Sequence, residues 1–266
     1  GVSSAASDVY KRQAADQIAL GYARTALVVG TESMTRNPIA AYTHRSGFRL
    51  GAPVEFKDFL WEALDDPAAR VSMIQTAENL ARRYGITRPE VDAYASQSQA
   101  RALAAQERGL FDEEIVTVDN EVLALEGYEP RAIRLPRKTA AQSRDTHPRH
   151  SPVEVLAGLR PVYEGGVQTA GNSSALVDGA AAAVVVHGGY LREHGLHALA
   201  RLRGAAAAGV PPEIMGIGPV PAIQALLQRA GLRLDEIGLF EVNEAQGAQT
   251  LAVARELEID LDRLNV

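Results

Sequence analysis

One polar side chain stands where an apolar strand is expected to end. Residues 238–242 (GLFEV) read as a buried strand, and Asn243 follows directly. In α/β enzymes, ligands bind at the carboxyl ends of strands, and reacting groups lie there. An Asn amide at such a point, or a water that it holds, can stabilise an oxyanion. The structural alternative is a helix N-cap, because Asn is among the best capping residues and a helix is expected to follow.

A second candidate is the loop from Val167 to Ser174, which is rich in small and polar residues. Small residues let a ligand approach the backbone closely. No Gly-Lys-Ser/Thr follows, so this is not a Walker phosphate loop. The structural alternative is an ordinary tight connection before Asp178.

Other residues also have two interpretations. Met215 belongs either to a core or to the wall of a narrow apolar channel. The pairs His147/His150 and His194/His197 lack a third ligand, so surface histidines are expected rather than a metal site. A basic stretch is either a solvated loop or a phosphate contact, where Arg is favoured. It comprises Arg131, Arg134, Arg137, Lys138, Arg144 and Arg149.

Helix and strand patterns alternate at both ends of the chain. Helices are expected through Ala19, ending near Gly21, and from Pro219 to Ala230, closed by Gly231. Strands are expected at 26–30, 115–118, 180–186 and 238–242. This pattern predicts an α/β fold with a covered, largely parallel sheet. The similar design of 14–29 and 219–242 suggests a duplicated half.

The middle of the chain differs from both ends in its sequence pattern. Eight prolines punctuate residues 35–160, which read as an insertion rather than sheet core. One helix is expected from a Thr76 cap to Tyr84. A capping box at Thr87 and Glu90 predicts a second helix that ends at Gly109. Its apolar face carries Val91, Tyr94, Ala95, Ser98 and Ala102.

Composition narrows the functional classes. The net charge of −6 over 266 residues argues against general nucleic-acid binding. No apolar run is long enough to span a bilayer, and residues 1–13 have no secretory signal pattern. We therefore expect a cytoplasmic protein with neither a nucleic-acid nor a membrane partner. The absence of cysteine excludes disulfides, thiolate metal sites and a Cys nucleophile within these residues.

Eight short motifs occur in order along the chain. They are GTESM (30–34), MIQTAENL (73–80), GLFDEEIV (109–116), LRP (159–161), TAGNSS (169–174), DGAA (178–181), MGIGPVP (215–221) and VNEA (242–245). From about Ala14 to Val266, this series resembles the thiolase family of acetyl-CoA acetyltransferases and 3-ketoacyl-CoA thiolases.

The resemblance implies two similar α/β halves stacked in five αβαβα layers, with a loop domain that covers CoA. Both halves are expected to be incomplete here. The implied division is 1–38 for the end of the N-terminal half (1–13 doubtful), 39–175 for the loop domain, 176–194 for the last strand region of the N-terminal half, and 195–266 for the start of the C-terminal half.

The resemblance also implies chemistry without a metal or redox cofactor, in which coenzyme A is a substrate. A Cys is acylated, while a His and a second Cys handle protons. The acyl group then passes to CoA or to the α-carbon of acetyl-CoA. The implied partners are acyl-CoA and CoA, and the parent protein is expected to be a homodimer or homotetramer.

The resemblance also implies roles for individual residues, assigned by their positions in these motifs. Asn243 matches the Asn that orients the oxyanion-hole water, and Ser174 matches a Ser near the pantetheine amide. The other matches are residues that lie around CoA in the family. Met73 and Met215 match residues that line the pantetheine tunnel, and Ala170 and Ala245 match small residues beside that tunnel. Tyr163 matches an aromatic residue near the tunnel, and Arg149 matches an Arg near the adenine and phosphates. The spacing from Arg149 to Arg160 is one residue short.

The chain departs from the family pattern in three places. Counting back from Ile18 puts Ser4 where the acyl-accepting Cys is expected, and residues 1–13 otherwise differ from the family. The Gly-His-Pro segment with the catalytic His is expected shortly after Val266. Gln246 replaces the usual Phe, which could reshape the acyl pocket. Because a hydroxyl nucleophile needs a base, we expect a thiolase fragment that alone has no turnover.

Two other functions compete with this interpretation. A non-catalytic, thiolase-like acyl-CoA or lipid binder would lack the Cys and Gly-His-Pro segments in its full-length gene. A condensing enzyme of the ketoacyl-synthase type is disfavoured by the Asn-Glu-Ala turn and the long insertion.

Overall fold

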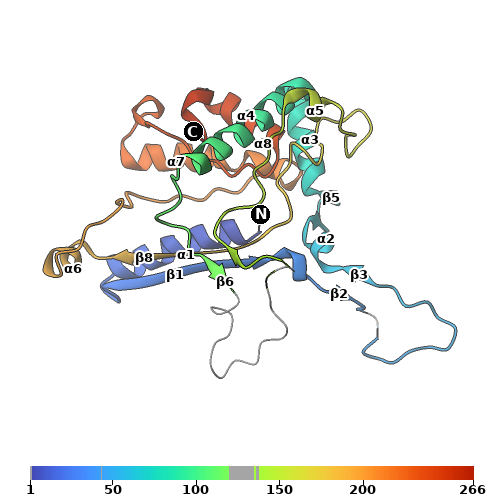
Figure 1. Ribbon diagram of the computed structural model, residues 1–266, viewed down its shortest axis with the longest axis horizontal. Helices are drawn as coiled ribbons and strands as arrows, with labels where there is room; N and C mark the ends of the chain where they lie inside the picture. The colour runs from blue at the N-terminus through green and yellow to red at the C-terminus, as the bar shows by residue number, and fades with distance from the viewer. Residues whose placement is uncertain (1, 43, 120–134, 136–137) are drawn as a thin grey trace.

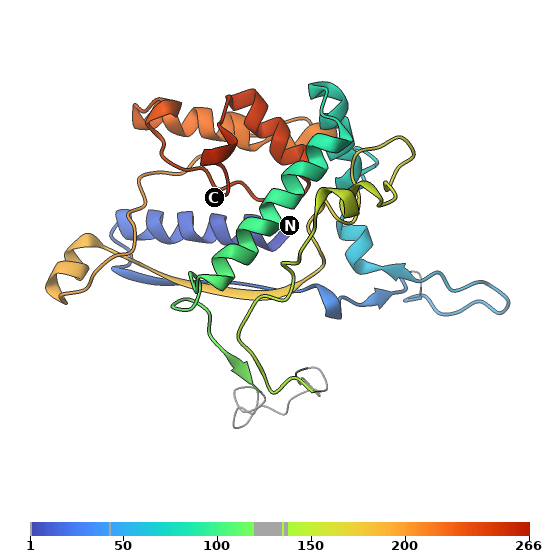
Figure 2. The same cartoon turned by 45° about the horizontal axis from the view of Figure 1, so that its top comes forward.

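The computed structural model describes residues 2–42, 44–119, 135 and 138–266, with side chains from residue 10 onward. A group of helices lies on one side of a long two-stranded ribbon, and α1 (Val2–Ala19) lies along that ribbon (Figures 1 and 2). Of the basic stretch, Arg131, Arg134 and Arg137 fall outside the described residues. In the described part of the chain, no helix is both long and apolar enough to cross a membrane.

The ribbon consists of β1 (Thr25–Ser33) and β8 (Asp178–Val186), which pair over their whole length from Thr25↔Val186 to Ser33↔Asp178. Both strands were predicted, and both are confirmed. Helix α1 covers one face, where it buries Val28. Strand residues alternate between faces, so Leu27 and its partner Val184 lie on the opposite face, where they are 69% and 67% exposed.

The expectation of a largely parallel sheet is wrong for the described residues. All four pairs of named strands in this part of the chain are antiparallel. An apolar run between turn signals indicates a buried strand, but it carries no information about the direction of its neighbour. One isolated bridge, between Phe240 and Leu264, is parallel.

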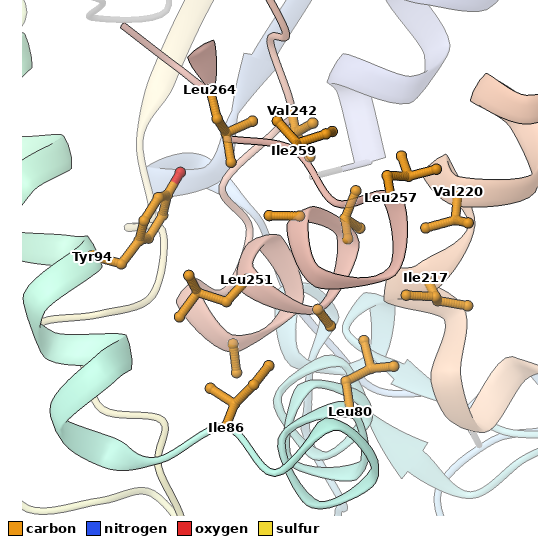
Figure 3. Packing of buried hydrophobic residues seen from close by; sticks show 14 of the residues in the cluster. Leu80, Ile86, Tyr94, Ile217, Val220, Val242, Leu251, Leu257, Ile259 and Leu264 are labelled. Carbon is orange, nitrogen blue, oxygen red and sulfur yellow. The ribbon is translucent and has the colours of Figure 1, made fainter. Parts of the chain in front are cut away.

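The main core surrounds α8 (Gly247–Leu257). Helices α3 (Met73–Tyr84), α4 (Arg88–Glu107) and α7 (Pro219–Ala230) pack against it, together with the 3₁₀ helix η2 (Pro212–Ile217). Figure 3 shows how apolar side chains from these elements meet around α8. Leu80, Val91, Val253 and Leu264 are fully buried there.

Local signals explain where these helices begin and end. Helix α3 begins one turn before the predicted Thr76 cap, because the Ser72 hydroxyl accepts the Gln75 N–H at 3.2 Å. The predicted capping box of α4 is confirmed, with the Thr87 N–H 2.7 Å from a Glu90 carboxylate oxygen. Gly85 and Gly231 adopt the left-handed conformation that ends α3 and α7.

Shorter elements complete the chain. They are η1 (Met34–Arg36), β2 (Ile39–Ala40), β3 (Lys57–Asp58), α2 (Phe59–Ala63), β4 (Asp65–Asp66), β5 (Val71–Ser72), β6 (Val118–Asp119), β7 (Ala141–Gln142), α5 (Val153–Ala157), α6 (Gly188–Glu193), η3 (Leu234–Glu236) and η4 (Leu261–Arg263). The strand expected at 115–118 is reduced to β6. The strand expected at 238–242 is reduced to the Phe240 bridge, because only the 263–265 segment pairs with it.

Candidate functional site

Two segments about seventy residues apart in sequence meet at the start of α8. The Ser174 N–H donates to the Ala245 carbonyl at 3.0 Å, and the Gly247 N–H donates to the Asn172 carbonyl at 3.0 Å. Ser173 and Gln246 form an antiparallel bridge between these two bonds. The fold therefore places the small-residue loop, with Ala170 and Ser174, against the turn that carries Asn243 and Ala245.

A buried carboxylate holds the start of this loop. Glu78 of α3 accepts the N–H groups of Val167 and Gln168 at 2.9 and 2.8 Å. Hydrogen bonds from backbone N–H groups to a carboxylate are among the stronger hydrogen bonds in proteins. Gly166 also approaches Glu78 so closely that an added Cβ would lie 2.5 Å from its Oε1. The path of the loop is thus fixed by α3.

A second buried group holds the end of the loop. The Asn172 amide oxygen accepts the Thr169 N–H at 2.7 Å, and its NH₂ donates to the Val167 carbonyl at 3.0 Å and to Asp92 at 2.8 Å. Asp92 is also paired with Arg88 at 2.7 Å. Because both partners of the buried Asp92 are present, its desolvation is offset.

Asn243 is exposed and does not cap a helix. Helix α8 begins at Gly247 and has Gln246 at its N-cap position, three residues beyond Asn243. The capping interpretation is therefore wrong. Among the described residues, none forms a hydrogen bond with the Asn243 side chain. Its amide is available to a ligand or a water.

The residues on either side of Asn243 are held firmly. Asn265 pairs through its amide with both backbone groups of Val242, and Glu244 accepts from Tyr94, Ser98 and Asn265. Burial, followed by the hydrogen bond to Glu244, raises the pKa of the Tyr94 phenol above its ordinary range. That hydroxyl therefore stays protonated and remains a donor.

Sequence reasoning found only half of this group. It placed Tyr94 and Ser98 on one face of the helix, but it gave no role to Glu244 or Asn265. The available signal was the spacing of four residues between two hydroxyl side chains on a largely apolar helix face. Nothing local marks Asn265 as their partner, because the contact joins positions more than 160 residues apart.

The Tyr163 hydroxyl lies at the start of α3, whose first residue is Met73. The Tyr163 hydroxyl is 2.8 Å from the hydroxyl of Ser72, the residue directly before Met73. Met215 is 46% exposed in η2, which packs on both α3 and α8. Helix α3 thus carries Met73, lies beside the Tyr163 hydroxyl and packs against the η2 segment that carries Met215, and its Glu78 holds the loop.

Gln246 uses its side chain to join the loop to the turn. Its amide oxygen accepts the Ser173 hydroxyl at 2.6 Å, and the same hydroxyl lies 3.4 Å from the Gln168 amide oxygen. The Gln168 side chain is fully buried, and its NH₂ group has no hydrogen-bond partner in the described part of the chain. Gln246 therefore makes a polar contact at the position where the resemblance implies a Phe ring.

Two predicted residues remain unconnected to this group. Arg149 is exposed, and its backbone N–H donates to Gln99 of α4 at 2.9 Å. Within the described ranges, no hydrogen bond or ion pair joins Arg149 to the Ser174–Ala245 contact. Ser4 lies in α1, but its side chain is outside the described part.

Within the described ranges, neither a metal-binding cluster nor a groove beside α4 coincides with the predicted site residues. The described residues contain no cluster of three or more His, Cys, Asp or Glu side chains that could hold a metal. A groove of about 760 Å³ runs between α4 and the end of α8, lined by residues that include Tyr94, Leu251, Arg255 and Ile259. None of the predicted site residues lines it.

Known proteins match the chain along almost all of its length. The family described as thiolase, N-terminal domain, matches residues 2–189, and thiolase, C-terminal domain, matches residues 196–266. Human mitochondrial 3-ketoacyl-CoA thiolase is 39% identical over 94% of this chain and 60% of its own length. The acetyl-CoA acetyltransferase of Escherichia coli K12 is 41% identical over 95% of this chain and 62% of its own.

Solved structures agree with these matches. The crystal structure of human mitochondrial 3-ketoacyl-CoA thiolase superposes with a TM-score of 0.87 at 37% identity, covering 99% of this chain and 63% of that one. The same enzyme in complex with CoA gives a TM-score of 0.86 at 38% identity, covering 99% and 62%. The chain spans about 60% of the length of the curated relatives that it matches. It has a mixed α/β thiolase fold and belongs to the thiolase family.

Proposed function

We propose that the protein carrying this chain is a thiolase-type acyl-CoA C-acyltransferase. It would make or break the carbon–carbon bond next to a CoA thioester, acting on 3-ketoacyl-CoA or acetyl-CoA. Membership of the thiolase family supports this reaction class, and one solved relative was crystallised in complex with CoA. The finer fold, with five layers and a CoA-covering segment at 39–175, is part of the same proposal, as is a homodimeric or homotetrameric assembly.

One observation carries the proposal: the contact between the 169–174 loop and the 243–247 turn. In this site Asn243 supplies an amide, directly or through water, for the thioester oxyanion. Ser174, Ala170 and Ala245 form the small-residue surface along which a pantetheine chain would lie. Met73, Met215 and Tyr163 provide apolar contacts to that chain, and Arg149 provides a positive charge for the phosphates.

The Cys nucleophile and the His base that the resemblance implies have no match among the 266 residues of this chain. The chain contains no cysteine, and by the resemblance none of its six histidines matches the family's catalytic base. Without an activated nucleophile, only binding and oxyanion stabilisation remain. These residues by themselves are therefore expected to show no thiolysis, and activity is proposed for the whole protein.

The test is CoA-dependent cleavage of acetoacetyl-CoA by the whole protein. We expect turnover, and we expect Asn243→Ala to lower kcat by roughly 10²–10³-fold while leaving the fold intact. The matched control is Glu241→Gln, two residues away and also exposed, which should leave kcat unchanged. An equal kcat for the Asn243→Ala protein would contradict the role of the amide.

A non-catalytic acyl-CoA or lipid-binding protein is the alternative, since no cysteine is present in these residues. It predicts calorimetric binding of CoA or acyl-CoA by the whole protein without cleavage of acetoacetyl-CoA or longer 3-ketoacyl-CoA. That outcome would overturn the enzyme proposal.

A further inference from the structure

Glu244, the residue after Asn243, is held by donors from two distant segments. The Tyr94 hydroxyl and the Ser98 hydroxyl, both on α4, donate to its two carboxylate oxygens. The Asn265 NH₂ donates to the same carboxylate at 2.9 Å. An ionised carboxylate only accepts hydrogen bonds, and bonds to a charged acceptor are about twice as strong as neutral ones. Three such bonds fix the position of Glu244 relative to α4.

Val242, the residue before Asn243, is held by one amide side chain. The Asn265 amide oxygen accepts the Val242 N–H at 2.8 Å, and its NH₂ donates to the Val242 carbonyl at 2.7 Å. This side chain therefore satisfies both backbone groups of Val242, as a neighbouring strand would. Asn265 itself has a φ of 50°, which Asn tolerates better than most residues.

Arg101 fixes the segment that carries Asn265. Its guanidinium donates to the carbonyls of Leu264 and Asn265 at 2.8 and 3.2 Å, and to that of Leu261 at 3.3 Å. Leu264 is fully buried beside α8, and Figure 3 shows the Tyr94 ring reaching from α4 toward Leu264. The segment, the turn and α4 are thus joined on one side of the core.

We name Tyr94, Ser98, Glu244 and Asn265 the turn clamp. A purely structural role would explain the hydrogen bonds among these four residues, because satisfied polar networks rigidify a protein interior. It does not explain why both neighbours of Asn243 are held while the Asn243 amide is exposed and free of protein partners within the described ranges. That arrangement fixes the backbone of a residue whose side chain stays available to a ligand.

We propose that the turn clamp positions the Asn243 amide for the oxyanion, and that α4 sets this position. The inference rests on the proposed function. Because α4 lies within the segment proposed to cover CoA, oxyanion stabilisation would depend on the placement of that segment. The clamp residues do not touch the reacting atoms, so they are positioning residues rather than catalytic ones.

The kinetic test removes single hydroxyls in the whole protein. Tyr94→Phe and Ser98→Ala should each lower kcat for acetoacetyl-CoA thiolysis by roughly 10–100-fold, as expected for a misplaced catalytic group, with the KM for CoA changed less than about twofold. Ser96→Ala is the matched control, because it removes a hydroxyl from the same helix outside the clamp. Equal kcat values for the Ser98→Ala and Ser96→Ala proteins would overturn the proposal.

A double variant separates positioning from general destabilisation. If Tyr94 acts only through Asn243, Tyr94→Phe should lower kcat no further once Asn243→Ala is present. If the double variant instead shows the product of the two separate losses in kcat, the proposal is contradicted. Hydrogen exchange gives a readout without catalysis: Tyr94→Phe should speed exchange of the amides at 240–246, whereas Ser96→Ala should not. Unchanged exchange would show that the clamp does not hold the turn.

These outcomes also separate the two proposals. A wild-type protein without thiolysis refutes the proposed function, and with it the catalytic meaning of the clamp, even if exchange at 240–246 responds. A wild-type protein with normal thiolysis and unaffected clamp variants refutes the positioning role alone.

Discussion

The α8 region and the β1–β8 ribbon are built from similar apolar runs but differ sharply in burial. Nine of the eleven residues of α8 are buried, because α3, α4, α7 and η2 surround it. In the ribbon, Val28 is the one buried residue of β1, and β8 contributes none. An apolar run thus indicates that a segment is suited to burial, but the elements that pack around it determine whether it is buried. Asn243 is attached to the better-packed region.

This contrast predicts two levels of local stability. Amides of α8 should exchange only through global unfolding, whereas amides of β1 and β8 should exchange through local opening of the ribbon. A two-stranded ribbon is marginal by itself, and one face of this one is open. We therefore expect exchange in the ribbon to be faster by roughly 10³-fold or more, measured residue by residue in a polypeptide of these 266 residues. Similar protection in both regions would remove the contrast.

Truncating one leucine in each region should also reveal the difference in packing between the two regions. Leu80 is fully buried against α8, and Leu27 is exposed on the open face. Leu80→Ala should lower the free energy of unfolding by about 2–5 kcal/mol, since it deletes buried apolar contacts and leaves a cavity. Leu27→Ala, the matched control, should change it by less than about 0.5 kcal/mol. Denaturant titrations monitored by circular dichroism measure both, and equal losses would contradict the difference in packing.

Two glycines, one in each region, test how each region tolerates an added side-chain atom. A Cβ on Gly247 would lie 2.8 Å from Val91 and 3.2 Å from the Asn172 carbonyl, whereas one on Gly179 of β8 would meet open space. Gly247→Ala should therefore cost about 1–3 kcal/mol by overpacking, and Gly179→Ala should be neutral or slightly stabilising. Comparing the two unfolding midpoints checks this. A stable Gly247→Ala protein would mean that the loop and turn can separate.

The sequence predicted elements better than it predicted contacts. Periodicity and end signals located β1, β8, α4 and α7, because such signals are local. They could not give the direction of β8 relative to β1, since strand direction depends on the rest of the sheet. They also placed the start of α3 one turn late, because Ser72 and Thr76 have the same type of hydroxyl.

At the candidate site, too, the sequence predicted residues better than it predicted the contacts between them. The motif order predicted the thiolase family, which the comparisons confirm, and it selected Asn243, Ser174 and Ala245. The hydrogen bonds that hold this group come from Glu78, Asp92 and Asn265, at distances in sequence that no local pattern encodes.

The smallest effects concern two carboxylates, one in each region. Hydrogen bonds from Thr87, first from its backbone and then from its side chain, lower the pKa of Glu90 below its ordinary value of 4.5. Hydrogen bonds from Thr35, first from its side chain, lower the pKa of Asp178 in the ribbon below 3.8. Both pKa values are lower in the folded state. At pH values above its ordinary pKa, the Glu90 carboxylate therefore stabilises the fold and the Asp178 carboxylate stabilises the closed ribbon. Each effect is lost as the pH falls through the folded-state pKa of the group.

Glu90→Gln should reduce the free energy of unfolding at pH 7 by less than about 1 kcal/mol, because Glu90 is partly exposed and solvent screens it. The difference from wild type should shrink below pH 4.5 as the wild-type carboxylate takes up a proton. Asp178→Asn should leave the unfolding midpoint unchanged and speed exchange only near Thr35, since the ribbon opens locally before the α8 region unfolds. A shifted midpoint for Asp178→Asn would mean that the ribbon and the α8 region unfold together, which would erase the distinction between them.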